Sequence, residues 1–89
     1  MEEPIISRKY LHFKGKEYEV IALAKDCEDP ARQFVVYKQL YESKTPIGTV
    51  WIRSLEDFVG DKEFKEDTDI NGRLFRKGEK VKKFVLIPE

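Results

Sequence analysis

The sequence KYLHFKGKEYEVIALAKD, residues 9–26, decides the fold. The residues before its turn are predicted to be extended, with Tyr10 and His12 on the same face. Gly15 stands between two lysines and indicates a turn, and the apolar run over residues 17–24 predicts a second strand. We therefore expect this stretch to form the first half of a β-sheet core.

The second of these strands has no polar face over residues 20–24. Such a strand is typical of a central position in a sheet, or of a barrel strand that passes from one packing surface to another. Strict alternation places Val20, Ala22 and Ala24 on one face and Ile21 and Leu23 on the other.

Residues 34–41 allow two interpretations. The Asp29-Pro30 pair could begin a helix whose apolar side would carry Phe34, Tyr37 and Tyr41 at helical spacing. The run Phe-Val-Val-Tyr, however, is aromatic and β-branched, which favours a strand. We predict the strand, paired as a hairpin with the strand before it, and keep the helix as the alternative.

A second turn is predicted at residues 43–48, which contain proline and glycine, and a third core strand follows over residues 49–53. This strand would place Val50 and Ile52 on one face and Thr49, Trp51 and Arg53 on the other.

Ser54, with Asp57 three residues later, resembles a capping box and predicts a single helical turn over residues 54–59. Leu55 and Phe58 would close one end of the core from this turn.

The C-terminal third contains two segments of opposite charge. Residues 60–69 are mainly acidic and residues 73–83 are mainly basic, so we expect them to lie close together on the surface. Between them, Asn71-Gly72 predicts a type I′ hairpin turn, since both central positions of that turn need positive φ. A last apolar strand is predicted over residues 84–87.

Together these elements predict a mainly β protein with one short helical turn. The expected architecture is a small, strongly bent antiparallel sheet or a partly open barrel of SH3-like type. Residues 1–89 would form a single small domain, with residues 1–7 as a loose N-terminal tail.

Composition limits the classes of function. Lys and Arg together number 17 and Asp and Glu together number 17, so no overall field attracts the chain to nucleic acid or to a membrane, and any such affinity would need a local patch. No apolar run approaches the ~20 residues of a membrane span. A lone cysteine, Cys27, rules out an internal disulfide and fits a reducing, cytoplasmic location.

Several residues recur in the order and spacing of a known family. They are Tyr10, His12, Phe13, Lys14, Gly15, Tyr18, Val20 and Ala24, then Val35, Val36, Tyr37, Leu40 and Tyr41, then Gly48, Trp51, Arg53 and Phe58. Over residues 9–59 the chain resembles the small bacterial family called domain of unknown function 1653. The chain departs from that pattern at Ser54, where members tend to have proline, and at Cys27, where they tend to have serine or threonine. The resemblance implies a compact β-rich domain and implies no activity.

No pattern in the sequence points to catalysis. One histidine and one cysteine far apart do not make a metal site, the acidic run lacks the spacing of a calcium loop, and no phosphate-binding glycine motif occurs. We therefore expect no catalytic residue, no metal and no cofactor.

The strongest candidate is a ligand-binding face that would combine aromatic planes with polar groups. Its predicted residues are Tyr10, His12, Tyr37, Tyr41, Trp51 and Arg53. If they share one face of the sheet, they could hold a protein or peptide partner, or alternatively stack the bases of a single-stranded nucleic acid or a nucleotide. The competing interpretation is that Tyr18, Tyr37 and Trp51 are core residues and that Arg53 pairs with a carboxylate of the helical turn.

Overall fold

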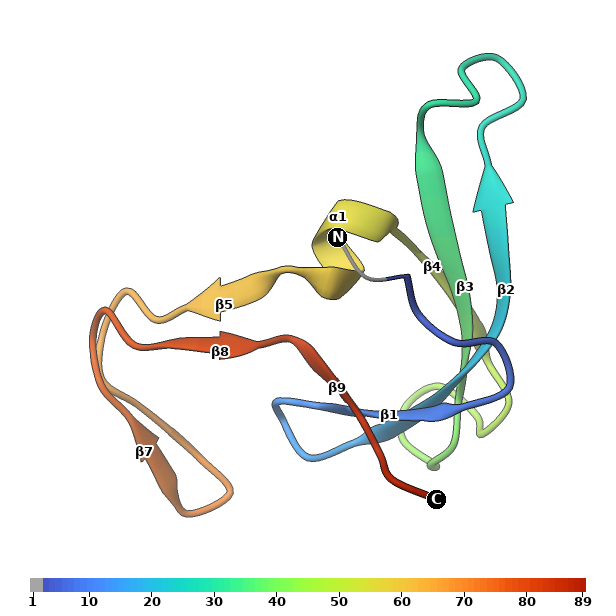
Figure 1. Cartoon of the computed structure of the whole chain (residues 1–89). Helices are drawn as coiled ribbons and strands as arrows, with labels where there is room; N and C mark the ends of the chain where they lie inside the picture. The colour runs from blue at the N-terminus through green and yellow to red at the C-terminus, as the bar shows by residue number, and fades with distance from the viewer. Residues whose placement is uncertain (1–2) are drawn as a thin grey trace.

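A computed structural model describes residues 3–89 of the chain. Its centre is a five-stranded antiparallel sheet with the strand order β4-β3-β2-β1-β9 (Figure 1). The strands are β1 (Lys9–His12), β2 (Glu17–Lys25), β3 (Gln33–Gln39), β4 (Val50–Ser54) and β9 (Phe84–Leu86). The mainly β class and the bent antiparallel sheet are confirmed. In the described residues the sheet does not close into a barrel, because its edge strands β4 and β9 are not paired with each other.

The sheet is strongly bent. In Figure 1, β1 and β9 run across the lower part of the view at a steep angle to β3. The short helix α1 (Leu55–Val59) follows β4 directly and packs on one side of the sheet, which we call the inner face. We call the opposite side the outer face.

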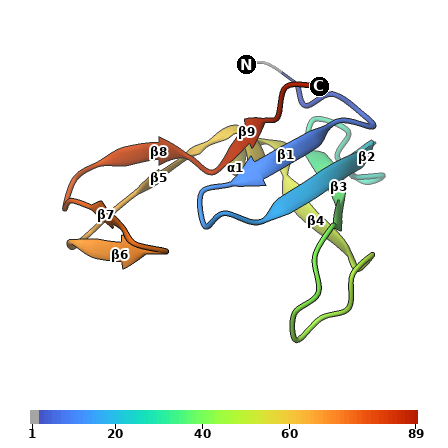
Figure 2. The same ribbon diagram turned by 90° about the horizontal axis from the view of Figure 1, so that it is seen from below.

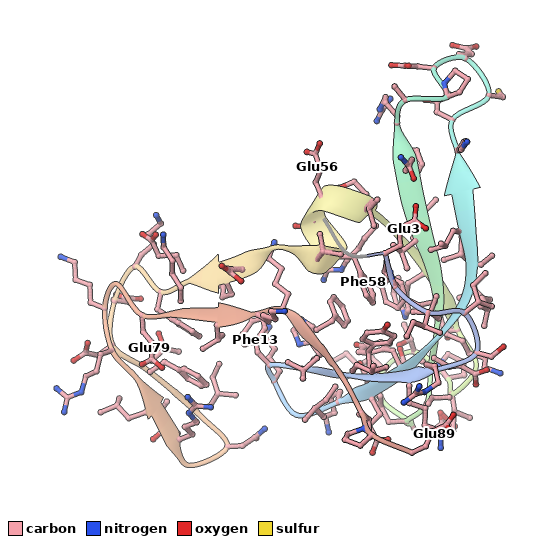
Figure 3. All side chains as sticks on the ribbon, viewed as in Figure 1. Glu3, Phe13, Glu56, Phe58, Glu79 and Glu89 are labelled. Carbon is pink, nitrogen blue, oxygen red and sulfur yellow. The ribbon has the colours of Figure 1, made fainter. Side chains whose placement is uncertain are left out.

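The hydrophobic core lies between α1 and the inner face. Phe58 of α1 is 2% exposed, and its ring stacks on that of Phe84 with 4.1 Å between centroids. Tyr10 and Tyr37 meet the Phe58 ring with 5.5 Å between centroids in each case. Figure 3 shows Phe58 between α1 and the strands. The core consists of Tyr10, Val20, Val35, Tyr37, Phe58 and Phe84.

The predicted alternation along β2 is wrong beyond Val20. A bulge shifts the register, because Val20 is opposite Tyr37 whereas Ala22 is opposite Val36 and Leu23 is opposite Val35. The extra residue places Leu23 on the same face as Val20 instead of the opposite one. A single inserted residue leaves no sign in a strand that is apolar on both faces.

Residues 34–39 are strand, so the prediction is confirmed and the alternative helix is wrong. Val35, Tyr37 and Gln39 are buried in alternation along β3, which is the period of a strand with one face on the core. The predicted cap of α1 is also confirmed, since the Ser54 hydroxyl accepts a hydrogen bond from the Asp57 N–H at 3.2 Å.

Residues 61–82 form a separate arm, which extends to one side of the sheet in both views (Figure 2). It consists of β5 (Asp61–Glu63) paired with β8 (Lys80–Lys82), and β6 (Thr68–Ile70) paired with β7 (Arg73–Phe75). The expected approach of the acidic and basic segments is confirmed by the pairing of Asp61 with Lys82 and of Glu63 with Lys80.

The arm has its own small core and its own turn. Phe64 and Phe75 are almost fully buried and stack with 4.5 Å between ring centroids. Asn71 and Gly72 have φ values of 54° and 84°, as the predicted hairpin turn requires.

The first two residues of the predicted tail lie outside the described residues. From Pro4, which is buried, the chain contacts the sheet: the Ile5 N–H donates to the Tyr10 hydroxyl at 2.9 Å, and the Ser7 N–H donates to the Val20 carbonyl at 2.7 Å. Within residues 3–89, no helix is long and apolar enough to cross a membrane.

Candidate functional site

The strand register brings five of the six predicted binding residues to the inner face. Directly opposed residues share a face, and so do residues two apart in a strand. Tyr10 is opposite Tyr18 in β2, and Val20 in the same strand is opposite Tyr37, which in turn is opposite Trp51. By the same rule His12 follows Tyr10, and Arg53 follows Trp51.

The sixth residue, Tyr41, lies just beyond β3 and joins this group through its hydroxyl. The Tyr41 and Tyr18 oxygens are 2.5 Å apart, and the two rings meet edge to face at 5.4 Å. Burial, followed by the hydrogen bond to Tyr41, raises the pKa of the Tyr18 hydroxyl well above its usual range. The Tyr18 hydroxyl therefore stays protonated and neutral.

Tyr10 and Tyr37 belong to the core. They are 8% and 4% exposed, under α1 and β9, so their ring faces are not open to a ligand. Trp51 is 40% exposed, because it lies on edge strand β4 where the inner face meets solvent. The six residues thus divide into a buried pair and a rim, which we define as His12, Tyr41, Trp51 and Arg53.

Arg53 is fixed by two partners on different elements. Its Nε donates to the Tyr37 hydroxyl at 2.8 Å, and its Nη1 donates to the Asp57 carboxylate at 2.5 Å. Asp57 also accepts a hydrogen bond from the Lys83 ammonium. The bond from Lys83, together with the one from Arg53, lowers the pKa of the Asp57 carboxyl. This network links α1 to β4 and to the residue preceding β9.

His12 is a neutral group at physiological pH. Its ring lies against Phe13 and Phe84, with centroids at 4.3 and 4.9 Å, and its Nδ1 accepts from the Lys14 N–H at 3.2 Å. Burial lowers the His12 pKa to about 4, assisted by the positive charges of Arg53, Lys14 and Lys83. Its other ring nitrogen therefore carries the hydrogen and can only donate.

Gln39 connects two rim residues, Tyr41 and Trp51, through hydrogen bonds. The sequence patterns did not identify it. The side chain is 1% exposed, and its Nε2 donates to the carbonyls of Tyr41 and Thr45 at 2.8 and 2.9 Å. Its Oε1 accepts from the Trp51 indole N–H at 3.1 Å and from the Thr45 hydroxyl at 2.8 Å. The detectable signal was a polar residue two positions after Tyr37, on the core face of a predicted strand.

We expect Gln39→Leu to lower stability by about 2 kcal/mol, because the Trp51 indole and two carbonyls lose their partner while the side-chain volume is kept. Gln33→Leu, at the exposed start of the same strand, is the matched control and should change stability by less than about 0.5 kcal/mol. Urea unfolding followed by circular dichroism compares the two. Equal midpoints for the two variants would contradict this role.

The described residues contain no group of three or more His, Cys, Asp or Glu side chains able to hold a metal ion. Cys27 lies exposed in the loop between β2 and β3. A hollow of about 420 Å³ opens on the far side of the core, between residues 3–5, α1 and β9. Its lining includes Tyr10 but none of the rim residues.

Comparison with known proteins identifies the chain's relatives. A family model described as "Protein of unknown function (DUF1653)" matches residues 8–73. The chain belongs to this family. No curated protein and no solved structure gives a significant match.

The DUF1653 match extends further than the resemblance noted in the sequence, which ended near residue 59. It covers β1 to β4 with α1, and it continues into the arm as far as β7. All rim residues lie inside it. Ser54 lies inside the matched segment, and its hydroxyl supplies the cap of α1.

Proposed function

We propose that the domain is a non-catalytic protein-interaction module that binds an extended segment of a partner along β4, with Trp51 and Arg53 as anchors. The observation that carries this proposal is the exposure of three consecutive apolar residues on an edge strand. Val50, Trp51 and Ile52 are 55%, 40% and 62% exposed. An exposed apolar edge strand is a template for pairing with another strand.

The geometry of β4 suits the addition of a strand. The backbone supplies hydrogen bonds along its free edge, while side chains on the two faces supply specificity. Trp51 and Arg53 stand on the inner face, and Val50 and Ile52 stand on the outer face. A bound segment would therefore place aliphatic residues on the outer face and an aromatic or acidic residue on the inner face.

The alternative, single-stranded nucleic acid, has less support. Base stacking needs open aromatic planes. Tyr10 and Tyr37 are covered. The ammonium groups of two lysines lie over aromatic rings: Lys16 is 5.3 Å from the Tyr41 centroid and Lys14 is 6.0 Å from that of Phe13. The formal net charge of zero adds no general attraction to phosphates.

A selection of phage-displayed random peptides of about twelve residues tests the proposal. We expect peptides with alternating apolar residues that bind the wild-type protein in the micromolar range. Trp51→Ala should weaken their binding about tenfold because it removes an aromatic anchor. Lys14→Ala, at the other side of the rim, should change it less than about twofold.

The salt dependence of binding distinguishes the two candidate functions. Binding of a selected peptide should vary little with salt concentration, whereas nucleic-acid binding falls steeply with it. A single-stranded oligothymidylate is the comparison probe, and we expect no measurable binding. Salt-sensitive binding of that probe, or a failure to enrich any peptide that depends on Trp51, would contradict the proposed function.

A further inference from the structure

We infer that the segment bound along β4 is β4 of a second copy of this chain, so that two sheets join edge to edge into one continuous sheet. This inference rests on the proposed function, because it names the partner of the same edge. It follows from the order of residues in β4, Val-Trp-Ile-Arg-Ser, and from the faces on which they lie.

The side chains of β4 complement themselves in one register. When two antiparallel copies meet about a twofold axis at Ile52, Trp51 of each copy is opposite Arg53 of the other. Val50 is opposite Ser54 at each end. A register centred on Arg53 would instead place two guanidinium groups opposite each other, and directly opposed like charges are destabilising.

The hydrogen-bonding pattern of the β4 backbone also favours a twofold axis at Ile52. The Gln39 N–H donates to the Thr49 carbonyl at 2.9 Å, so residue 49 bonds inward to β3. In an antiparallel ladder the bonded residues alternate, so Trp51 and Arg53 also bond inward, and the N–H and C=O of Ile52 point outward. Two Ile52 residues can then exchange both of their backbone hydrogen bonds across the axis.

The Trp51 indole and the Arg53 guanidinium are fixed in position by hydrogen bonds within each copy before they contact each other across the axis. The indole N–H is fixed by Gln39 and the guanidinium by Tyr37 and Asp57, yet both side chains keep an exposed part, 40% of Trp51 and 33% of the Arg53 side chain. A guanidinium against an indole face is a favourable cation–π pair. Twofold symmetry forms this pair twice on the inner faces while Ile52 meets Ile52 on the outer faces.

The overall charge does not oppose the association of two copies. With 17 basic and 17 acidic residues the formal net charge is zero, so two copies approach without overall repulsion. A strand of five residues buries less surface than a standard interface, so we expect a weak dimer with a Kd of about 10–500 µM.

Disulfide trapping tests the register. In a Cys27→Ser background, oxidation should link Ile52→Cys to itself, since the Cα atoms of a hydrogen-bonded pair lie about 5.5 Å apart, within disulfide range. Val50→Cys should not link to itself, because its two copies lie four residues out of register, roughly 13 Å apart. A mixture of Val50→Cys and Ser54→Cys should form the mixed dimer. Equal trapping of Val50→Cys and Ile52→Cys, or no trapping of Ile52→Cys, would overturn the inference.

Sedimentation equilibrium on the full chain, at concentrations from about 10 µM to 1 mM, measures the dimer directly. Ile52→Lys should raise Kd at least tenfold, because it places two ammonium groups at the axis. Val85→Lys, at a half-exposed position on the opposite edge strand, should leave Kd within about twofold. Both positions are exposed, and circular dichroism verifies that each variant is folded.

The outcomes separate this inference from the proposed function. A wild-type chain that stays monomeric up to about 1 mM, but binds selected peptides through Trp51, would refute the second copy and leave the interaction module standing. A dimer that Ile52→Lys does not weaken would place the contact elsewhere and overturn the inference. A chain that neither dimerises nor binds peptides would overturn both.

Discussion

Replacing Phe58 with alanine is expected to lower the free energy of unfolding by about 3–5 kcal/mol. The side chain is 2% exposed and stacks on Phe84, with Tyr10 and Tyr37 against its edges. Its removal leaves a cavity where α1 meets Tyr37 of β3 and Phe84 of β9. A small domain has a total of about 5–15 kcal/mol, so this variant should be marginally folded.

Phe34→Ala is the matched control for this prediction, because Phe34 is a partly exposed phenylalanine on the outer face. We expect it to lower stability by about 1 kcal/mol, in proportion to its smaller buried area. Urea unfolding of the two variants side by side measures the difference. Similar losses for Phe58→Ala and Phe34→Ala would show that α1 does not close the core.

Acid is expected to destabilise the domain through His12. The pKa of His12 is about 4 in the folded chain, against 6.5 for the free side chain, so folding favours the neutral ring. Stability from this residue is fully present above pH 6.5 and is lost as the pH falls towards 4. The loss should be about 1–2 kcal/mol, less than the full shift would give, because the ring is only partly buried.

His12→Phe separates this effect from other titrations. The variant keeps a ring against Phe84 and removes the ionisable nitrogen, so it should lack the loss of stability that His12 causes between pH 6.5 and pH 4. The Asp57 carboxyl has a lowered pKa, so its contribution is lost only below that range. Urea unfolding at a series of pH values measures the stability of each protein, and proton NMR follows the titration of the His12 ring. A ring that titrates near pH 6.5 would contradict the prediction.

Local patterns predicted most of the secondary structure because they depend on neighbouring residues. Gly15 and Asn71-Gly72 specify turns that need positive φ, and each has it in the structure. Ser54 and Asp57 specify the start of α1 through a side chain that bonds the next turn of backbone. The bulge after Val20 could not be found in this way, because both faces of β2 are apolar and either register satisfies the pattern.

The sequence predicted which candidate residues share a face of their own strand, but it did not predict which of them are buried. Alternation within each strand placed Tyr10 with His12 and Trp51 with Arg53. Whether those faces coincide, and which rings α1 covers, depends on pairings between residues far apart in the sequence. The same is true of Gln39, whose burial is explained only by the loop carbonyls and the indole that its amide contacts.

The arm gives the chain an extended shape, with a radius of gyration of 14.1 Å where a compact chain of this length has about 12 Å. Its aromatic pair, Phe64 and Phe75, is separate from the cluster around Phe58, and few contacts join the two, among them Phe13 against Phe64 and the Asn71 amide on the Lys14 carbonyl. Sub-global opening follows boundaries of this kind. We therefore expect the arm to open and close while the five-stranded sheet stays intact, so that the two parts unfold as separate cooperative units.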